Sequence, residues 1–171
     1  MKKIVVFGAS GDTGRYFIEY FLENNKSNNY EIVAVGTRET TYFNELKVSY
    51  YQVDITKKCD FEKLPKDVYA VVNLAGLMPA RMEGYDPYKY IDVNIIGNLN
   101  ILEYCRENGA DRILFAQSFG DIKDWAEDEL VLTADMPRNF KFNTDHTIYV
   151  MCKNFTVDMM KYYNQMYNCE N

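Results

Sequence analysis

The chain has 171 residues and a formal net charge of −6 at pH 7. A chain of this length can bury roughly two thirds of its unfolded surface in one core, and its acidic balance argues against bulk affinity for nucleic acid or for anionic lipid. No stretch has the length and apolarity of a signal peptide or of a membrane span. We therefore expect one cytoplasmic domain over residues 1–171, with small molecules or proteins as its partners.

Residues 3–7, KIVVF, form the first predicted strand, because they are apolar and β-branched without alternation, as expected of a strand covered on both faces. The glycine turn G-x-x-G-x-x-G follows at Gly8, Gly11 and Gly14, and a helix is predicted over residues 13–25. This order presents backbone N–H groups and a positive helix end to a pyrophosphate. A side chain at Gly8 or Gly11 would block a dinucleotide, and one at Gly14 would hold the helix off the strand.

The second predicted strand, residues 31–35, ends where the choice between NAD and NADP is made. An acidic residue at this point accepts a hydrogen bond from the adenosine ribose of NAD, but this chain has Gly36 there and Arg38 two residues later. A guanidinium suits a 2′-phosphate, so we favour NADP, with NAD as the alternative. Arg38 could also be a solvated loop cation, and Arg15 either a second phosphate contact or a surface residue.

Three further strands and two helices complete the prediction. The strands are expected at residues 48–53, 69–75 and 112–117, and the helices at residues 87–108 and 145–167. The polar connection over residues 118–143 is long enough to expect a functional role or ordering by a ligand. This alternation predicts a doubly wound parallel α/β sheet of the Rossmann type, with right-handed crossovers.

Two helix ends carry a recognisable signal. Gly109 is expected just after the helix over residues 87–108. The last helix is expected to be capped by Asn143, Thr144 or Asp145.

The cysteines and the histidine exclude most metal and thiol chemistry. Cys59, Cys105, Cys152 and Cys169 are scattered and form no C-x-x-C pair, so we expect buried thiols rather than a zinc or dithiol centre. His146 is the only histidine, which excludes histidine-rich metal sites. A Ser-His-Asp hydrolase built on it stays open, although no G-x-S-x-G motif is present.

Tyr149 and Lys153 stand four residues apart, which places both on one face of the last helix. The ordinary tyrosine pKa of about 10 is too high for proton transfer near neutrality, but an adjacent ammonium favours the phenolate and lowers that pKa. Tyr149 is therefore a candidate general acid/base. With 15 tyrosines in the chain, a chance match to this spacing is the alternative.

Six segments, in order, resemble the extended short-chain dehydrogenases/reductases of the NAD-dependent epimerase/dehydratase family. They are GASGDTG (8–14), VDI (53–55), NLAG (73–76), DVNIIGNLNILEYC (92–105), FAQSFGD (115–121) and YVMCK (149–153). The resemblance covers essentially the whole chain, and six ordered matches are far more specific than any one of them.

The resemblance implies hydride transfer between a nicotinamide and, typically, a nucleotide-linked sugar. Ser118 would hydrogen-bond the substrate carbonyl or alcohol, and Tyr149 would pass its proton. Lys153 would bind the nicotinamide ribose and keep the tyrosine acidic, while Asn94 would support the arrangement through its backbone and a water. Asp54 would meet the adenine amino group. The residues expected to bind the cofactor are Gly8, Ser10, Gly11, Asp12, Thr13, Gly14, Thr37, Arg38, Asp54, Ile55, Leu74, Ala75, Gly76, Tyr149 and Lys153.

Several residues depart from the family pattern. Asp12 and Thr13 replace an apolar pair, and Asp12 either faces the pyrophosphate or polarises the helix start. The segment FGDIKDW after Ser118 differs from the small-residue and Val-Tyr-Gly pattern of many members, and the Thr-Asp-Glu arrangement of sugar dehydratases is missing. His146, one turn before Tyr149, either reaches the substrate or belongs to the helix cap.

Family members typically continue into further strands and a small substrate-binding domain, which are absent after Asn171. We expect a fragment or a chain completed by another. The first hypothesis is an epimerase or reductase of a sugar nucleotide. The alternatives are a dinucleotide-binding module without turnover, acting as a sensor, regulatory subunit or remnant, and a reductase of a small ketone or aldehyde.

The resemblance also suggests a homodimer through the helices that bear Asn94 and Tyr149. Four apolar side chains are expected to face outward on the second of these helices: Met159, Met160, Tyr163 and Met166.

Overall fold

The computed structural model describes residues 1–25, 29–78, 86–128, 131–133, 135–142 and 146–167. Within them, parallel strands form one sheet in the order β3-β2-β1-β4-β5. The strands are β1 (Lys2–Phe7), β2 (Tyr30–Gly36), β3 (Ser49–Gln52), β4 (Val68–Asn73) and β5 (Arg112–Phe115). The predicted doubly wound parallel sheet is confirmed.

Helices follow the strands as the alternation predicts. The α-helices are α1 (Asp12–Asn24), α2 (Tyr42–Glu45), α3 (Pro87–Ile91), α4 (Gly97–Glu107) and α5 (His146–Tyr167). Three short 3₁₀ helices are η1 (Lys58–Lys63), η3 (Phe119–Asp121) and η4 (Lys123–Asp128), and one π-helical turn is η2 (Asp92–Ile96). The sequence did not predict α2 and η1, because such short helices have no measurable hydrophobic period.

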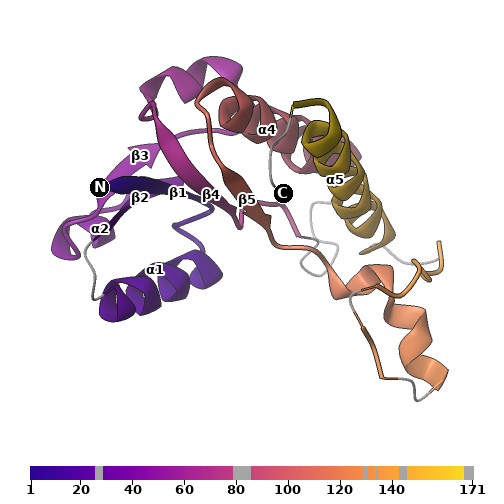
Figure 1. The fold of residues 1–171 in the computed structure, drawn as a ribbon. Coiled ribbons are helices and arrows are strands. Elements are labelled where there is room, and N and C mark those ends of the chain that lie inside the picture. The colour runs from indigo at the N-terminus through magenta and orange to yellow at the C-terminus, as the bar shows by residue number, and fades with distance from the viewer. Residues whose placement is uncertain (26–28, 79–85, 129–130, 134, 143–145, 168–171) are drawn as a thin grey trace.

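Helices cover both faces of the sheet, with α1 and α2 on one side and α4 and α5 on the other (Figure 1). Successive residues of β1 enter different cores: Val6 packs in a cluster with Ile18 of α1, and Val5 in a cluster with Ile101 of α4. Both β1 residues are fully buried. The uninterrupted apolar run of β1 follows from this double burial.

The predicted helix over residues 87–108 is three helical segments in succession, α3, η2 and α4. Within η2 the carbonyl oxygen of Asn94 accepts hydrogen bonds from Thr156 Oγ1 at 3.1 Å and Asn98 Nδ2 at 2.6 Å. Single π-helical turns of this kind are frequent at functional sites. Gly109 follows α4 with a φ of +65°, which confirms its predicted place after the helix.

Two other predictions can be compared with the fold. Cys105 and Cys152 are buried as expected, but Cys59, which lies in η1, is exposed. The predicted caps of the last helix at residues 143–145, and Cys169, lie outside the described residues.

Candidate functional site

A cavity of about 330 Å³ opens at the carboxyl ends of β1, β2, β3 and β4. In open parallel sheets, ligands bind at this edge where the strand order reverses, which here is between β1 and β4. Many residues of the predicted cofactor set line it: Gly8, Ser10, Gly11, Thr37, Arg38, Asp54, Ile55, Leu74, Ala75 and Gly76. The fold thus brings together residues from four separate segments of the chain.

The three glycines of the turn serve different purposes. Gly8 has a φ of +78°, and a Cβ there would lie 2.7 Å from the main chain of Leu74 and Ala75. A Cβ at Gly14 would lie 2.4 Å from the carbonyl oxygen of Gly8. At Gly11 the nearest atom would be 3.4 Å away, so this exposed N-cap of α1 is free of internal obstruction. The fold itself therefore requires glycine at positions 8 and 14, whereas it leaves room for a side chain at Gly11.

Three residues of the predicted cofactor set, Asp12, Thr13 and Gly14, do not line the cavity. Asp12 and Thr13 are exposed, because the first turn of α1 directs them to solvent, and Gly14 is buried against Gly8. Asp12 is the first residue of α1. Its carboxylate therefore stands at the positive end of the helix.

Gly36 stands where NAD-binding folds carry an acidic residue, and a side chain there would have to displace the side chains of Ser10 and Tyr50. A Cβ would lie 2.5 Å from Ser10 Oγ and 2.9 Å from the Tyr50 hydroxyl. The same Tyr50 hydroxyl donates a hydrogen bond to the carbonyl oxygen of Arg38. The Arg38 side chain is exposed at the cavity and makes no hydrogen bond or ion pair with a described residue.

Arg15 is engaged by its neighbours on the other side of the glycine turn. Its guanidinium carbon lies 4.8 Å from the centroid of the Tyr42 ring, whose hydroxyl donates to Glu19. The Arg15 Nε is buried and has no hydrogen-bond partner among the described residues. Arg15 does not line the cavity.

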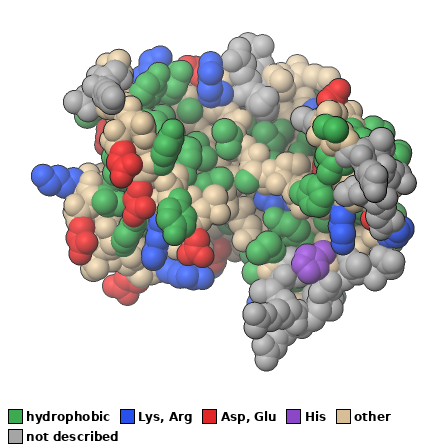
Figure 2. All heavy atoms as spheres, turned by 90° about the horizontal axis from the view of Figure 1, so that it is seen from below, with side chains coloured by type: hydrophobic (Ala, Val, Ile, Leu, Met, Phe, Trp, Pro, Cys, Tyr) green, Lys and Arg blue, Asp and Glu red, His purple; other side chains and the backbone are tan. Residues whose placement is uncertain are grey.

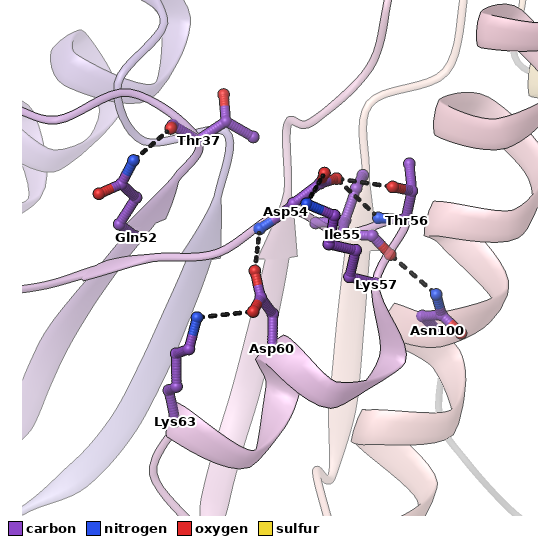
Figure 3. A network of polar contacts seen from close by, with 9 residues as sticks. All are labelled: Thr37, Gln52, Asp54, Ile55, Thr56, Lys57, Asp60, Lys63 and Asn100. Carbon is purple, nitrogen blue, oxygen red and sulfur yellow. Dashed lines mark hydrogen bonds and ion pairs between the residues drawn. The ribbon is translucent and has the colours of Figure 1, made fainter.

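Asp54 lies at the end of β3 in a network of polar contacts (Figure 3). Its Oδ1 accepts hydrogen bonds from the Thr56 backbone N at 3.1 Å and from Thr56 Oγ1 at 2.8 Å, and its Oδ2 lies 3.6 Å from Lys57 Nζ. The Asp54 backbone N donates to Asp60 Oδ2 at 2.9 Å. Asp54 therefore lines the cavity with its carboxylate held in one orientation, and Ile55 beside it supplies an apolar wall.

Asn94 and Lys153 do not line the cavity, but both come from their separate helical segments to lie beside Gly76, which does. A Cβ at Gly76 would lie 3.1 Å from Asn94 Oδ1 and 3.6 Å from Lys153 Nζ. The fully buried Asn94 side chain donates to the Leu77 carbonyl oxygen and accepts from the Leu77 N–H, both at 2.9 Å. The Asn94 side chain thus holds the backbone of Leu77, while its carbonyl oxygen, which was expected to support the site, accepts hydrogen bonds from Thr156 and Asn98.

Lys153 does not lower the pKa of Tyr149, contrary to our prediction. The Lys153 ammonium donates to the carbonyl oxygen of Ala116 at 2.8 Å and lies 4.3 Å from the Phe115 ring centroid, but 5.6 Å from that of Tyr149. Burial lowers the pKa of Lys153 to about 8. Burial also raises the pKa of Tyr149 above its ordinary value, because desolvation of the phenolate is not offset by a nearby ammonium.

A second cavity of about 310 Å³ contains Ser118, Tyr149 and His146. It adjoins the first through consecutive residues, since Leu77 lines one cavity and Met78 the other. Ser118 Oγ accepts a hydrogen bond from the Gly120 N–H at 3.1 Å. Figure 2 shows the surface hollowed between the side that carries α1 and the side that carries η3 and η4.

The sequence missed part of both linings. Leu77 and Met78 directly follow the NLAG segment, so an extension of that motif would have found them. Lys123, Phe140 and Lys141 lie in the connection between β5 and α5, where no periodic pattern predicts a position. Only the packing of that connection against α5 brings them to Tyr149.

Two kinds of feature are missing from the described ranges. They contain no helix that is long and apolar enough to cross a membrane. Nor do they bring together three or more His, Cys, Asp or Glu side chains in a way that could hold a metal ion.

Comparisons with known proteins agree with this geometry. The model of the NAD dependent epimerase/dehydratase family matches residues 4–170. The chain is 31% identical over 130 residues to the UDP-glucuronate 4-epimerase of Thermodesulfobacterium geofontis, covering 67% of this chain and 38% of that protein. It is 23% identical over 184 residues to UDP-glucose 4-epimerase 1 of Oryza sativa subsp. japonica, covering 96% of this chain and 51% of that protein.

Solved structures share the fold. The UDP-glucose 4-epimerase of Thermus thermophilus in complex with NAD matches with a TM-score of 0.79 at 22% identity, over 97% of this chain and 52% of that one. The uronate dehydrogenase of Agrobacterium tumefaciens matches with a TM-score of 0.75 at 20% identity, over 99% and 58%. The chain spans about half the length of the curated relatives that it matches from end to end.

Proposed function

Because the chain belongs to the NAD dependent epimerase/dehydratase family, we propose that residues 1–171 form one dinucleotide-binding domain that carries out hydride transfer. The partners in this transfer are a nicotinamide cofactor and a sugar nucleotide or a similar polar carbonyl or alcohol. One observation carries the proposal: Gly76 of the glycine-lined cavity lies beside buried Lys153, and Tyr149, one turn before Lys153 on α5, lines the second cavity.

The first cavity has the features that a dinucleotide needs. Gly11 leaves the start of α1 without a side-chain cap, so that backbone N–H groups can hold the diphosphate. The adenine would lie against Ile55 beside the Asp54 carboxylate. Lys153 would bind the nicotinamide ribose near Gly76. The nicotinamide, when bound, supplies the hydride chemistry.

The preferred cofactor in this proposal is NADP. Gly36 has no carboxylate to repel a 2′-phosphate, and its place is filled by Ser10 and Tyr50. The exposed Arg38 guanidinium at the cavity has no partner among the described residues and is available for charge-assisted hydrogen bonds. NAD, which the Thermus structure contains, is the alternative.

Tyr149 passes the proton in this mechanism, and Ser118 orients the reacting oxygen. Both residues line the second cavity. Since burial raises the pKa of Tyr149, proton transfer near neutrality requires that Lys153 turn from the Ala116 carbonyl toward the phenol. An ammonium close to the phenolate would then lower that pKa. The protein's part is to hold the substrate oxygen and to move this proton.

The experiment compares Tyr149→Phe with Tyr20→Phe, which makes the same chemical change at an exposed residue of α1. With UDP-glucose or UDP-galactose as substrate, we expect Tyr149→Phe to abolish turnover while NADPH, followed by fluorescence, still binds. Tyr20→Phe should change neither. Wild-type turnover by Tyr149→Phe would remove the acid/base role.

A dinucleotide-binding module without turnover is the second candidate. It is favoured by the present position of Lys153, whose ammonium is held by the Ala116 carbonyl while the pKa of Tyr149 is raised. Such a module would still bind NADPH, and Arg38→Ala would still weaken that binding. It would show no turnover with any sugar nucleotide, and Tyr149→Phe would have no effect on it.

We further propose that the protein is a homodimer through α5 and the helical segment around Asn94. The predicted outward set is partly wrong, because Tyr163 is buried and donates to Glu103, and Met159 and Met160 pack against the core. The exposed apolar side chains that form one stripe on α5 are instead Met151, Phe155, Tyr162 and Met166. Spacings of four, seven and four residues place them on one helix face. A second copy of the chain is proposed to pack against this face.

A further inference from the structure

We infer that Gln117 is a positioning residue that fixes Ser118 relative to the turn of α5 carrying Lys153, an inference that rests on the proposed function. The Gln117 Oε1 accepts a hydrogen bond from the Ser118 N–H at 3.0 Å. Its Nε2 donates to Asn154 Oδ1, also at 3.0 Å. One side chain therefore spans the distance from the end of β5 to α5.

A second link joins the same two elements beside this bridge. Lys153 Nζ donates to the carbonyl oxygen of Ala116 at 2.8 Å, so that two consecutive residues of α5 hold two consecutive residues after β5. The side chains of Lys153 and Asn154 are both buried. Because Tyr149 lies one turn before Lys153 on the same helix, these links set how Ser118 lies relative to Tyr149.

A third hydrogen bond of Gln117 reaches the connection that follows. Its Nε2 also donates to Asp121 Oδ2 at 3.1 Å. The Asp121 carbonyl oxygen in turn accepts from the Asn139 N–H at 2.7 Å, and Arg138 donates to the Asn154 carbonyl oxygen at 3.2 Å. The connection between β5 and α5, which lines the second cavity, is thus hydrogen-bonded to Asn154, the same α5 residue that Gln117 contacts.

Position 117 requires an amide side chain, which both accepts and donates hydrogen bonds. Gln117 combines an acceptor for Ser118 with donors for Asn154 and Asp121, and a carboxylate of the same size can supply only the acceptor. A glutamate at this position would also face the Asp121 carboxylate and repel it. Replacing Asp121 by asparagine would restore that hydrogen bond with donor and acceptor exchanged.

The test uses Gln117→Glu, the double variant Gln117→Glu/Asp121→Asn, and the control Gln165→Glu, an exposed residue near the end of α5. The first readout needs no catalysis. Trp125 is the only tryptophan of the chain, and its indole donates to the Pro137 carbonyl oxygen at 2.8 Å within the same connection. Acrylamide quenching of its fluorescence therefore reports whether the connection stays packed.

We expect Gln117→Glu to increase the quenching of Trp125 and to shift the backbone amide signal of Ser118 in an NMR spectrum. The double variant should return both toward the wild-type values, and Gln165→Glu should change neither. With UDP-glucose and NADP⁺, kcat of Gln117→Glu should fall, by up to about a hundredfold for a displacement near 1 Å. The affinity for NADPH should stay unchanged, because Gln117 does not line the first cavity.

Wild-type quenching and an unshifted Ser118 signal in Gln117→Glu would overturn the inference. So would a double variant that is no closer to wild type than the single one. If the wild-type chain turns over no sugar nucleotide, the proposed function fails, while the quenching and the amide signal still decide the role of Gln117. Should Gln117→Glu not fold, Gln117→Asn, an amide too short to reach both elements, takes its place with the same expected results.

Discussion

Lys153 donates a hydrogen bond to the carbonyl oxygen of Ala116 at 2.8 Å, while its ammonium lies 5.6 Å from the centroid of the Tyr149 ring. The buried ammonium is thus held by a neutral acceptor and has no carboxylate as its first partner. Burial accordingly lowers the pKa of Lys153 to about 8. The group that is expected to support catalysis therefore reduces the stability of the fold at neutral pH.

This cost makes stability depend on pH in a defined direction. In the unfolded chain the pKa of a lysine is about 10.4, against about 8 for Lys153 in the folded chain. Between these values the unfolded chain binds more protons, so this group's contribution to stability rises with pH through that window, and its cost is fully present below pH 8.

Lys153→Met should therefore gain most in stability, relative to the wild type, at about pH 7, and this advantage should shrink by about pH 10. Urea unfolding at the two pH values measures the difference. Lys161→Met, at an exposed position of the same helix, is the control and should show no such trend. An advantage of Lys153→Met that is constant across this range would contradict the assignment.

Gly8→Ala and Gly11→Ala should separate folding from binding. Gly8→Ala should destabilise the protein, by about 1–2 kcal/mol for the left-handed backbone alone, with a further loss from contact with the main chain of Leu74 and Ala75. Gly11→Ala has a negative φ and no close neighbour, so it should lose only the smaller stability that a poorer N-cap costs, while NADPH binds more weakly. Thermal unfolding and a fluorescence titration measure the two effects. Equal loss of stability in both variants would be inconsistent with this division.

Arg38→Ala should weaken NADPH binding by roughly tenfold to a hundredfold, the effect of losing hydrogen bonds to a charged group. NADH binding should be unchanged, because NADH lacks the 2′-phosphate. The control is Arg112→Ala, at the opposite end of the sheet, at the start of β5. Parallel fluorescence titrations with the two nucleotides make the comparison. Equal losses for NADPH and NADH would remove the role of Arg38 in cofactor choice.

Phe155→Lys should convert the proposed dimer to a monomer, because it places a charge in the apolar stripe of α5, where Phe155 is 50% exposed. Phe142→Lys makes the same change at an exposed residue of the β5–α5 connection and should leave the dimer intact. Sedimentation velocity measures the mass of each variant. A wild-type chain that is monomeric at high concentration would remove the dimer altogether.

The strands and the glycine turn could be predicted because their causes are local. A run such as that of β1 has to be covered on both faces, and Gly8 precedes a helix start that needs close contact between main chains. The same holds for the order of the cofactor segments, since parallel strands deliver their carboxyl ends to one edge. The four-residue spacing of Tyr149 and Lys153 likewise follows from helix geometry alone.

Tertiary structure decided the burial, the charge state and the contacts of the side chains at these positions. The pKa values of Tyr149 and Lys153 depend on burial and on the Ala116 carbonyl, which no spacing within α5 reveals. Tyr163 is buried and not outward because Glu103 of α4 lies opposite it. Gln117 meets Asn154 only because the fold brings β5 and α5 together. Sequence therefore determines the elements and their order, whereas contacts between residues distant in the chain set charge, burial and orientation.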